Sequence, residues 1–311
     1  MKKNDSKKNI EIMNNFTLKN IPDLDVCVLA ALELFSQEKL PSIKIPYKRP
    51  LVVGSGNAAA TGEIIFQDYD AVFADESSYE NKLKKIKSID GVVLVSASGG
   101  KHAPIIAKKA KKYKKKVTLI TNNHEAPARK FADKTYVFPK NREPYTYNTS
   151  TYMGMVLGKT HEDAKTILEF VNDKIAKIRF PDLKKFNAFY IILPPKFETM
   201  MEMLDKKFVE LFGRRIAYTI STSEYIKHAT TVVSRPDELF ISFGYDNSTW
   251  GKHRLNIPLL KDCGHSGVMA ISYYVMGKIQ KSKPDWFKRN IADYCRKAGK
   301  IFGNEINPIV E

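Results

Sequence analysis

The chain has 311 residues, of which 43% are hydrophobic, and its 51 Lys and Arg against 34 Asp and Glu give a formal net charge of +17. This length favours two hydrophobic cores or one large one, and the apolar share excludes a chain that is disordered throughout. No apolar run reaches the roughly 18 residues of a membrane span, and the N-terminal MKKNDSKKNIEI lacks the apolar stretch of a signal peptide. We therefore expect a cytoplasmic protein with no membrane partner.

The three cysteines, Cys27, Cys263 and Cys295, lie far apart and include no C-x-x-C pair. They fit a reducing compartment and support neither a disulfide framework nor a zinc site. His253 and His265 have no partners at metal-ligand spacing, so we predict no catalytic metal and no cofactor.

The first dozen residues are polar and predict a frayed tail. After it, apolar runs typical of strands alternate with segments of helical periodicity. We expect helices over 24–37, 58–67, 79–89 and 103–116, and strands over 51–53, 71–75, 91–97, 117–121 and 135–139. This alternation predicts a parallel sheet covered by helices on both faces.

The basic run KKAKKYKKK over 108–116 falls at the end of one of these helices. Cations there interact favourably with the negative pole of the helix dipole. A nucleic-acid site would also need aromatic residues among the cations, and Tyr113 is the one present in the run. The run therefore indicates a solvated helix face, and we expect no nucleic-acid partner.

The second half repeats the pattern, with a buried strand over 189–194, a long helix over 197–213 and another strand over 238–244. Two helices follow, and the last has an apolar stripe that indicates packing against a core or an interface. Its residues are Phe287, Ile291, Tyr294, Cys295, Ala298, Ile301 and Phe302. We expect two α/β domains in tandem: a tail and helix over 1–45, a first domain over 46–180 and a second over 181–311.

Two turns in the first domain carry groups that bind anions. The first turn, Gly54-Ser55-Gly56-Asn57, lies between a strand and a helix, where glycines permit close backbone approach and a helix N-terminus presents unpaired amides. It is not a G-x-G-x-x-G motif, because Ala59 replaces the third glycine. By itself this turn is weak evidence for a ligand.

The second turn combines more of these features. Two hydroxyls end a strand, two glycines follow, and Ala103-Pro104 begins a helix. The residues concerned are Ser96, Ser98, Gly99, Gly100, Lys101 and His102. Hydroxyls, amides, a helix pole and a lysine that converge on one point favour a phosphate site, whereas serines that only cap the turn are the structural alternative.

The two turns together resemble the SIS (sugar isomerase) domain. The later segments ITNN (120–123), APARKFADKTYVFP (126–139) and REPYTYNTSTYMG (142–154) resemble that family's remaining motifs, in the same order. The resemblance covers roughly residues 46–180. It implies a five-stranded parallel sheet that binds phosphosugars, usually in a homodimer.

The resemblance also assigns roles to individual residues. Ser96 and Ser98 would hold the sugar phosphate, and Lys101 stands where the family has a threonine, so His102 could take part of that role. Ala58 stands where a serine is usual, which leaves Asn57 or Ser55 to contact the ligand. The residues implied to line the sugar end are Glu143, Thr149, Ser150 and Thr151.

The second half resembles the catalytic half of tandem SIS enzymes, such as the bifunctional phosphoglucose/phosphomannose isomerases and the isomerase half of glucosamine-6-phosphate synthase. It lacks the S-x-S-G turn, so we expect it to have lost its own phosphate site. The resemblance implies that Glu210 abstracts the C1/C2 proton and that His228 opens the sugar ring, tasks that suit a partly buried carboxylate and a neutral imidazole. Glu224 and His228, at i and i+4, are a second candidate pair, and an ordinary surface pair is the alternative.

We therefore predict an aldose–ketose isomerase that acts on a hexose phosphate. One departure from the family is the missing lysine near the C-terminus, since the last lysine is Lys300. Two alternatives stay open: a non-catalytic phosphosugar-binding or sensing protein, and a deglycase or deaminase that acts on a ketosamine or aminosugar phosphate.

Overall fold

The computed structural model describes residues 8–311, so the first seven residues of the predicted tail lie outside it. Residues 8–12, also predicted as tail, belong instead to a helix, α1 (Lys8–Asn15). By its internal contacts the chain divides into two compact units. Unit 1 holds residues 8–37, 141–150 and 162–311, and unit 2 holds residues 38–140 and 151–161.

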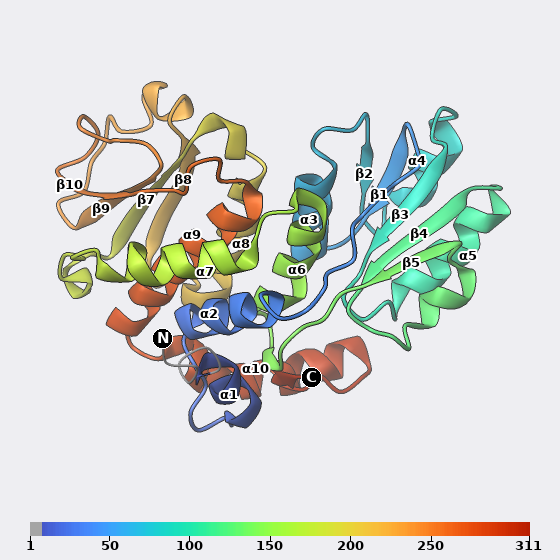
Figure 1. The fold of residues 1–311 in the computed structure, drawn as a ribbon, viewed down its shortest axis with the longest axis horizontal. Coiled ribbons are helices and arrows are strands. Elements are labelled where there is room, and N and C mark those ends of the chain that lie inside the picture. The colour runs from blue at the N-terminus through green and yellow to red at the C-terminus, as the bar shows by residue number, and fades with distance from the viewer. Residues whose placement is uncertain (1–7) are drawn as a thin grey trace. The chain divides into compact units, whose positions relative to one another are not determined.

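Unit 2 contains the predicted five-stranded sheet, in the order β2-β1-β3-β4-β5 with every pair parallel (Figure 1). Its strands are β1 (Pro50–Val53), β2 (Val72–Ala74), β3 (Gly91–Val95), β4 (Lys116–Thr121) and β5 (Lys134–Val137). Its helices are α3 (Asn57–Phe66), α4 (Tyr79–Lys85), α5 (His102–Lys112) and the 3₁₀ helix η1 (Pro127–Phe131). The predicted strands and helices of this half are confirmed to within a few residues, and η1 forms in a segment for which no element was predicted.

Helices cover both faces of this sheet (Figure 1). Leu51, Val92 and Leu119 point to the face on which α4, α5 and η1 pack. On the other face α3 lies so close that a Cβ at Gly62 would meet the side chain of Val52 at 2.8 Å. Because both faces are buried, β3 reads as a continuous apolar run rather than as an alternating one.

Unit 1 contains a second parallel sheet, in the order β10-β9-β7-β8. Its strands are β7 (Ala188–Leu193), β8 (Ala217–Thr222), β9 (Glu238–Phe243) and β10 (His253–Ile257). Its longer helices are α2 (Leu24–Phe35), α7 (Ala164–Asp173), α8 (Met200–Phe212), α9 (His265–Ser282) and α10 (Trp286–Phe302). Short elements complete it: η2 (Ile175–Lys177), η3 (Leu183–Lys185), η4 (Pro195–Phe197), η5 (Tyr225–Lys227), and the antiparallel pair β6 (Glu143–Pro144) and β11 (Ile309–Val310).

The units do not follow the predicted segments 46–180 and 181–311. Helix α2 is buried along most of its length and packs against α7 and α9, which places the N-terminal region in unit 1. The contact is close, because a Cβ at Gly277 of α9 would meet the backbone nitrogen of Asp25 at 2.2 Å. Helix α6 (Thr149–Thr160) was not predicted, and its first two residues belong to unit 1 and the rest to unit 2.

Two connections between parallel strands of the second sheet lack an α-helix: residues 223–237, between β8 and β9, contain only η5. Residues 244–252 join β9 to its parallel neighbour β10 without a helix, although such crossovers are usually longer and helical. On the face of Tyr190 and Phe240, this loop and η5 cover the sheet through Trp250, Tyr245 and Ile226. The helix whose N-terminus would bind a phosphate after β9 is therefore missing from this segment.

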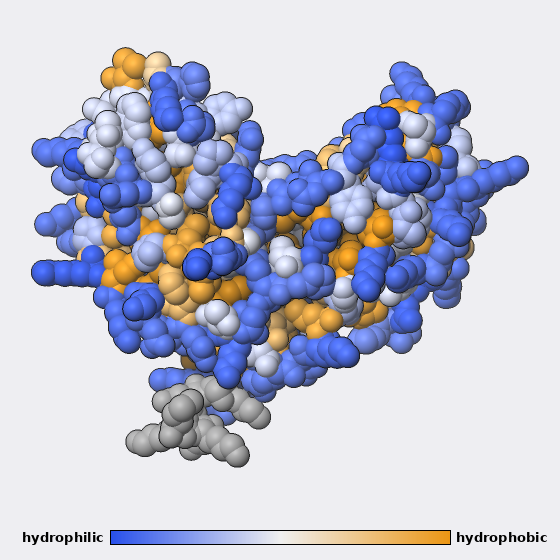
Figure 2. Space-filling view, turned by 45° about the horizontal axis from the view of Figure 1, so that its top comes forward, coloured by the Kyte–Doolittle hydropathy of each residue, from blue (hydrophilic) through white to orange (hydrophobic). Residues whose placement is uncertain are grey.

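The three cysteines are buried and free. Burial raises the pKa of Cys263 to about 12 and that of Cys27 well above its usual value, so these thiols are poor nucleophiles at neutral pH. None of the helices described in residues 8–311 is both long and apolar enough to cross a bilayer. Hydrophilic side chains cover most of the face that Figure 2 shows, in keeping with the excess of lysine.

Candidate functional site

The two predicted anion-binding turns meet at one edge of the first sheet. β1 and β3 are parallel neighbours, so Gly54–Asn57 and Ser96–His102 both follow the carboxyl ends of adjacent strands. In parallel α/β sheets, ligands bind outside the carboxyl ends of the strands, where helix N-termini also gather. The fold thus places both turns of unit 2 at the same edge of the sheet.

The Ser96–Gly100 turn is folded around its own hydroxyls. The amide of Gly99 donates to Ser96 Oγ, and the amide of Gly100 donates to Ser98 Oγ, each at 3.2 Å. Both serines therefore perform the capping role that was the structural alternative. Each hydroxyl still has its own proton to donate, so capping the turn and binding an oxyanion are compatible.

Neighbouring loops hold this turn in place. Ala97 O accepts hydrogen bonds from Thr121 Oγ1 at 2.8 Å and from the amide of Asn122 at 3.0 Å. Gly99 has φ +58°, and a Cβ there would lie 2.5 Å from that of Ala126, so both the backbone conformation and the space require glycine.

The first turn is built in a similar way. Gly56 is the N-cap of α3 with φ 57° and ψ −127°, and Gly54 leaves room for the backbone of Ala58, which a Cβ would meet at 2.7 Å. Ser55 donates a hydrogen bond from its hydroxyl to Glu76, while Asn57 is buried at the start of α3. The Ser55 hydroxyl proton is therefore directed to a carboxylate in this structure.

Lys101 has a backbone conformation that favours glycine. It is the N-cap of α5 with φ 45° and ψ −108°, close to the values of Gly56 at the same position of the other turn. Residues with a Cβ rarely adopt this region, and such strain is typical of functional sites. His102, directly after it, is exposed in the first turn of α5.

We expect Lys101→Gly to raise the free energy of unfolding by about 1 kcal/mol, because the strain disappears with the Cβ. The matched control is Gly56→Ala: no atom lies within 4 Å of a Cβ there, so this substitution tests the backbone conformation alone. It should lower stability by a similar amount. Chemical denaturation of both variants measures the effect, and a destabilised Lys101→Gly would contradict the assignment of strain.

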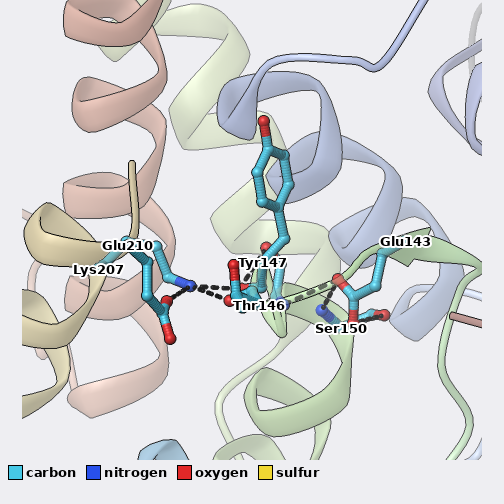
Figure 3. Close-up of polar contacts among 7 residues, drawn as sticks. Glu143, Thr146, Tyr147, Ser150, Lys207 and Glu210 are labelled. Carbon is cyan, nitrogen blue, oxygen red and sulfur yellow. Dashed lines mark hydrogen bonds and ion pairs between the residues drawn. The ribbon is translucent and has the colours of Figure 1, made fainter. Parts of the chain in front are cut away.

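Glu143 is a buried helix cap in unit 1. Its carboxylate accepts hydrogen bonds from the amide of Thr149 at 2.8 Å, and from the amide and hydroxyl of Ser150 at 3.3 and 3.1 Å (Figure 3). These contacts satisfy the first turn of α6. Thr151 follows on α6 in unit 2 and is also buried. The structure thus gives Glu143, Thr149 and Ser150 a role in shaping the backbone at the start of α6.

Glu210 is fixed by a lysine that the sequence analysis did not identify. Lys207, fully buried one turn earlier on α8, donates to Glu210 Oε2 and to the carbonyls of Thr146 and Tyr147, each at 2.6 Å (Figure 3). The helical periodicity of α8 could have indicated that Lys207 is buried, because this lysine continues the buried positions Met200, Met203 and Leu204. One ammonium group therefore orients the candidate base and a strained segment of backbone, in which Thr146 has φ 74°.

Glu210 also lines a cavity of about 480 Å³ within unit 1, between the end of α8 and α10. We call it the α8–α10 cavity. Its polar lining comprises Thr146, Glu210, Arg214, Arg215, Asn290 and Tyr294.

The other two catalytic candidates lie elsewhere on the second sheet. Glu224 and His228 flank the 3₁₀ turn η5 after the carboxyl end of β8 rather than lying on one helix face, as an i and i+4 pair would. Both are exposed, and Glu224 forms an ion pair with Lys227 at 2.8 Å. Glu224 is thus paired on the surface with Lys227, not with His228 as either interpretation of the spacing expected.

The topology separates Glu210 from His228 within one chain. Helix α8 runs back from the carboxyl end of β7 to the start of β8, so Glu210, in its last turn, lies near the amino edge of the sheet. His228 comes after the carboxyl end of β8, which is the opposite edge of the sheet. Since β8 has six residues, the two side chains are separated by roughly 15–20 Å along the strand direction.

No group of three or more His, Cys, Asp or Glu side chains that could hold a metal ion occurs among residues 8–311. No protein-family model matches the sequence, and no curated protein matches it either.

Solved structures, in contrast, match over nearly the whole chain. The C-terminal domain of a glucosamine-fructose-6-phosphate aminotransferase from Francisella tularensis superposes with a TM-score of 0.54 at 13% sequence identity, over 91% of this chain and 98% of that one. This chain has the SIS fold. A glucosamine-6-phosphate deaminase from Thermotoga maritima matches with a TM-score of 0.52 at 15% identity, over 88% and 93% of the two chains. A tagatose-6-phosphate ketose/aldose isomerase from Escherichia coli gives 0.52 at 10% identity, over 88% and 91%.

The predicted resemblance and fold class are confirmed at the level of the fold: two tandem α/β units of SIS type, each with a parallel sheet. In the SIS fold of this chain, the S-x-S-G turn occurs in unit 2 and has no counterpart after β9, as expected for the diverged second half. The roles of the individual site residues stay predictions.

Proposed function

We propose that this protein binds a phosphosugar at the Ser96–Gly100 turn. The observation that carries the proposal is the convergence of two hydroxyls and the N-terminus of α5 at the carboxyl edge of the first sheet, in a turn whose Gly99 and Gly100 amides donate to those hydroxyl oxygens. The names of the structural neighbours, which include a phosphosugar aminotransferase, a deaminase and an isomerase, support the same class of ligand.

Replacing Ser98 with alanine tests the binding site. The variant loses a hydroxyl donor to the phosphate and the acceptor that holds the Gly100 amide in the turn, so we expect affinity for glucose-6-phosphate or fructose-6-phosphate to fall about 10- to 100-fold. Calorimetric titration measures it. Ser88→Ala, which removes an exposed hydroxyl that accepts from Arg49, is the control and should bind like the wild type. Equal affinity of both variants would place the phosphate elsewhere.

We further propose that the reaction is aldose–ketose isomerisation of a hexose phosphate. Glu210 would take the proton at C2 and return it at C1 through a cis-enediol, and Lys207 would hold the carboxylate in place. The carboxylate is suited to this task because it lines a cavity and its side chain is 23% exposed, hence accessible yet partly desolvated.

His228 would open the sugar ring, but the separation within one chain does not allow it to act beside Glu210. We therefore propose that His228 acts in the site of a second copy, which agrees with the homodimer that the sequence resemblance implies. The exposed position of His228 on the loop after η5 makes it available to another molecule.

A second candidate reaction is the release of ammonia from an aminosugar phosphate. The match to a glucosamine-6-phosphate deaminase favours it. A ketosamine deglycase belongs to the same class of alternative. Incubation with glucosamine-6-phosphate and an assay for ammonia separates this reaction from isomerisation, and a protein that binds phosphosugars without turnover of any of them would be a binding or sensing protein.

A further inference from the structure

The α8–α10 cavity, which Glu210 lines, has features of a ligand site of its own, apart from the Ser96–Gly100 turn. Its floor is apolar, formed by the buried rings of Phe212 and Phe287 and by Ile291. Its volume, about 480 Å³, lies in the range of small-molecule sites. Trp286 and Tyr294 add two aromatic rings to the wall.

Two arginines give the cavity its charge. Arg214 and Arg215 follow Gly213 at the end of α8, and both are exposed. Across residues 8–311, no carboxylate lies within ion-pair distance of either guanidinium group. Arg215 instead lies over the ring of Trp286, with 6.0 Å between its guanidinium carbon and the ring centroid. Adjacent guanidinium groups without a carboxylate partner are suited to bidentate binding of a phosphate.

Another part of the lining is strained and polar. Thr146, a β-branched residue with φ 74°, contributes a buried hydroxyl that has no hydrogen-bond partner among the described residues. This conformation persists because Lys207 binds the carbonyls of Thr146 and Tyr147. Backbone strain of this kind is found where ligands bind. Glu210 and Asn290 complete the wall with groups that accept and donate hydrogen bonds to hydroxyls.

We infer that the α8–α10 cavity binds a phosphomonoester that carries a ring. The phosphate lies against Arg214 and Arg215, the ring packs on Trp286, and ring hydroxyls bond to Glu210 and Asn290. A hexose phosphate and a mononucleotide share this chemistry. The cavity shares no residue with the Ser96–Gly100 turn, so this is a second site, and its occupant would contact the carboxylate that we propose as the base.

Trp286 provides the signal for a test on the full chain. In a Trp250→Phe background, Trp286 is the only remaining tryptophan, and its fluorescence is followed during titration with glucose-6-phosphate, AMP or inorganic phosphate. We expect a saturable change with at least one of the two esters at millimolar concentrations or below. The ester that binds with the higher affinity shows whether the cavity prefers a hexose phosphate or a mononucleotide. Inorganic phosphate alone should bind more weakly than either ester, because it has no ring.

The charge variant is Arg214→Gln/Arg215→Gln, and the control is Arg289→Gln, an exposed arginine of α10 outside the cavity. The double variant should lose at least about tenfold in affinity, while Arg289→Gln keeps it. Circular dichroism checks that both variants are folded. The inference is overturned if neither ester changes the fluorescence, or if the change survives in the double variant.

Ser98→Ala distinguishes this site from the proposed substrate site. The fluorescence titration should be unchanged in that variant. If Ser98→Ala abolishes the signal, the ligand binds at the Ser96–Gly100 turn, and the second site is refuted while the proposed function stands. If Ser98→Ala leaves phosphosugar binding unchanged while Arg214→Gln/Arg215→Gln weakens it, the proposed site at the Ser96–Gly100 turn is refuted and the second site stands.

Discussion

Replacing Lys207 with methionine should destabilise the protein by about 3–5 kcal/mol. The ammonium group is fully buried and donates to three oxygens, those of Glu210, Thr146 and Tyr147. Methionine fills similar space but leaves two buried carbonyls and a partly buried carboxylate without their donor. Chemical denaturation followed by circular dichroism measures the change.

The control is Lys206→Met, on the same helix one residue earlier. Lys206 forms an ion pair with Glu202, whose side chain is 44% exposed, and a pair of this kind contributes at most about 1 kcal/mol. If the two variants unfolded at the same denaturant concentration, Lys207 would not be the anchor of this region. The Thr146 backbone, held with φ 74° by that lysine, would then need another explanation.

Glu210→Gln should lower the turnover of the preferred hexose phosphate by a factor of about 10² to 10⁴. Glutamine keeps the shape of the side chain and an oxygen that can accept from Lys207, but it cannot take a proton from carbon. Binding of the phosphosugar at the Ser96–Gly100 turn should be nearly unchanged, since the phosphate contacts proposed there do not involve Glu210. Coupled isomerase assays with glucose-, fructose- and mannose-6-phosphate measure turnover, and calorimetry measures binding.

A mixing experiment then tests whether His228 acts in a second copy. Glu210→Gln and His228→Ala are each expected to be inactive alone. If subunits exchange, about half of the dimers contain one chain of each kind, and one of their two sites has both wild-type residues. The mixture should thus recover about a quarter of the wild-type turnover. No recovery in a mixture shown to contain mixed dimers would refute the shared site.

Sequence patterns predicted the first sheet well because its strands are apolar on both faces and its turns carry glycine. β3, with GVVLV, and β4, with KVTLIT, are examples. β10, with HRLNI, escaped prediction because it is short, half polar and reached without a helix from β9. Helix α6 escaped because its start, TSTYMG, carries no periodic apolar stripe.

The site was predicted less completely, because its parts depend on contacts between distant segments. Glu143 was expected to meet a sugar, yet its carboxylate binds amides six and seven residues away. The separation of Glu210 from His228 follows from the antiparallel run of α8 along the sheet, which no spacing in the sequence reveals. The C-terminal segment lacks the lysine that the family has there. Its strand β11 pairs instead with β6, beside Glu143.

The most direct test of the central claim is a crystal structure of the protein soaked with fructose-6-phosphate. We predict density for the phosphate group within hydrogen-bond distance of Ser96, Ser98 and the first turn of α5. A phosphate bound anywhere else, with the Ser96–Gly100 turn empty at saturating ligand, would contradict the proposed phosphosugar site and the isomerase chemistry that depends on it.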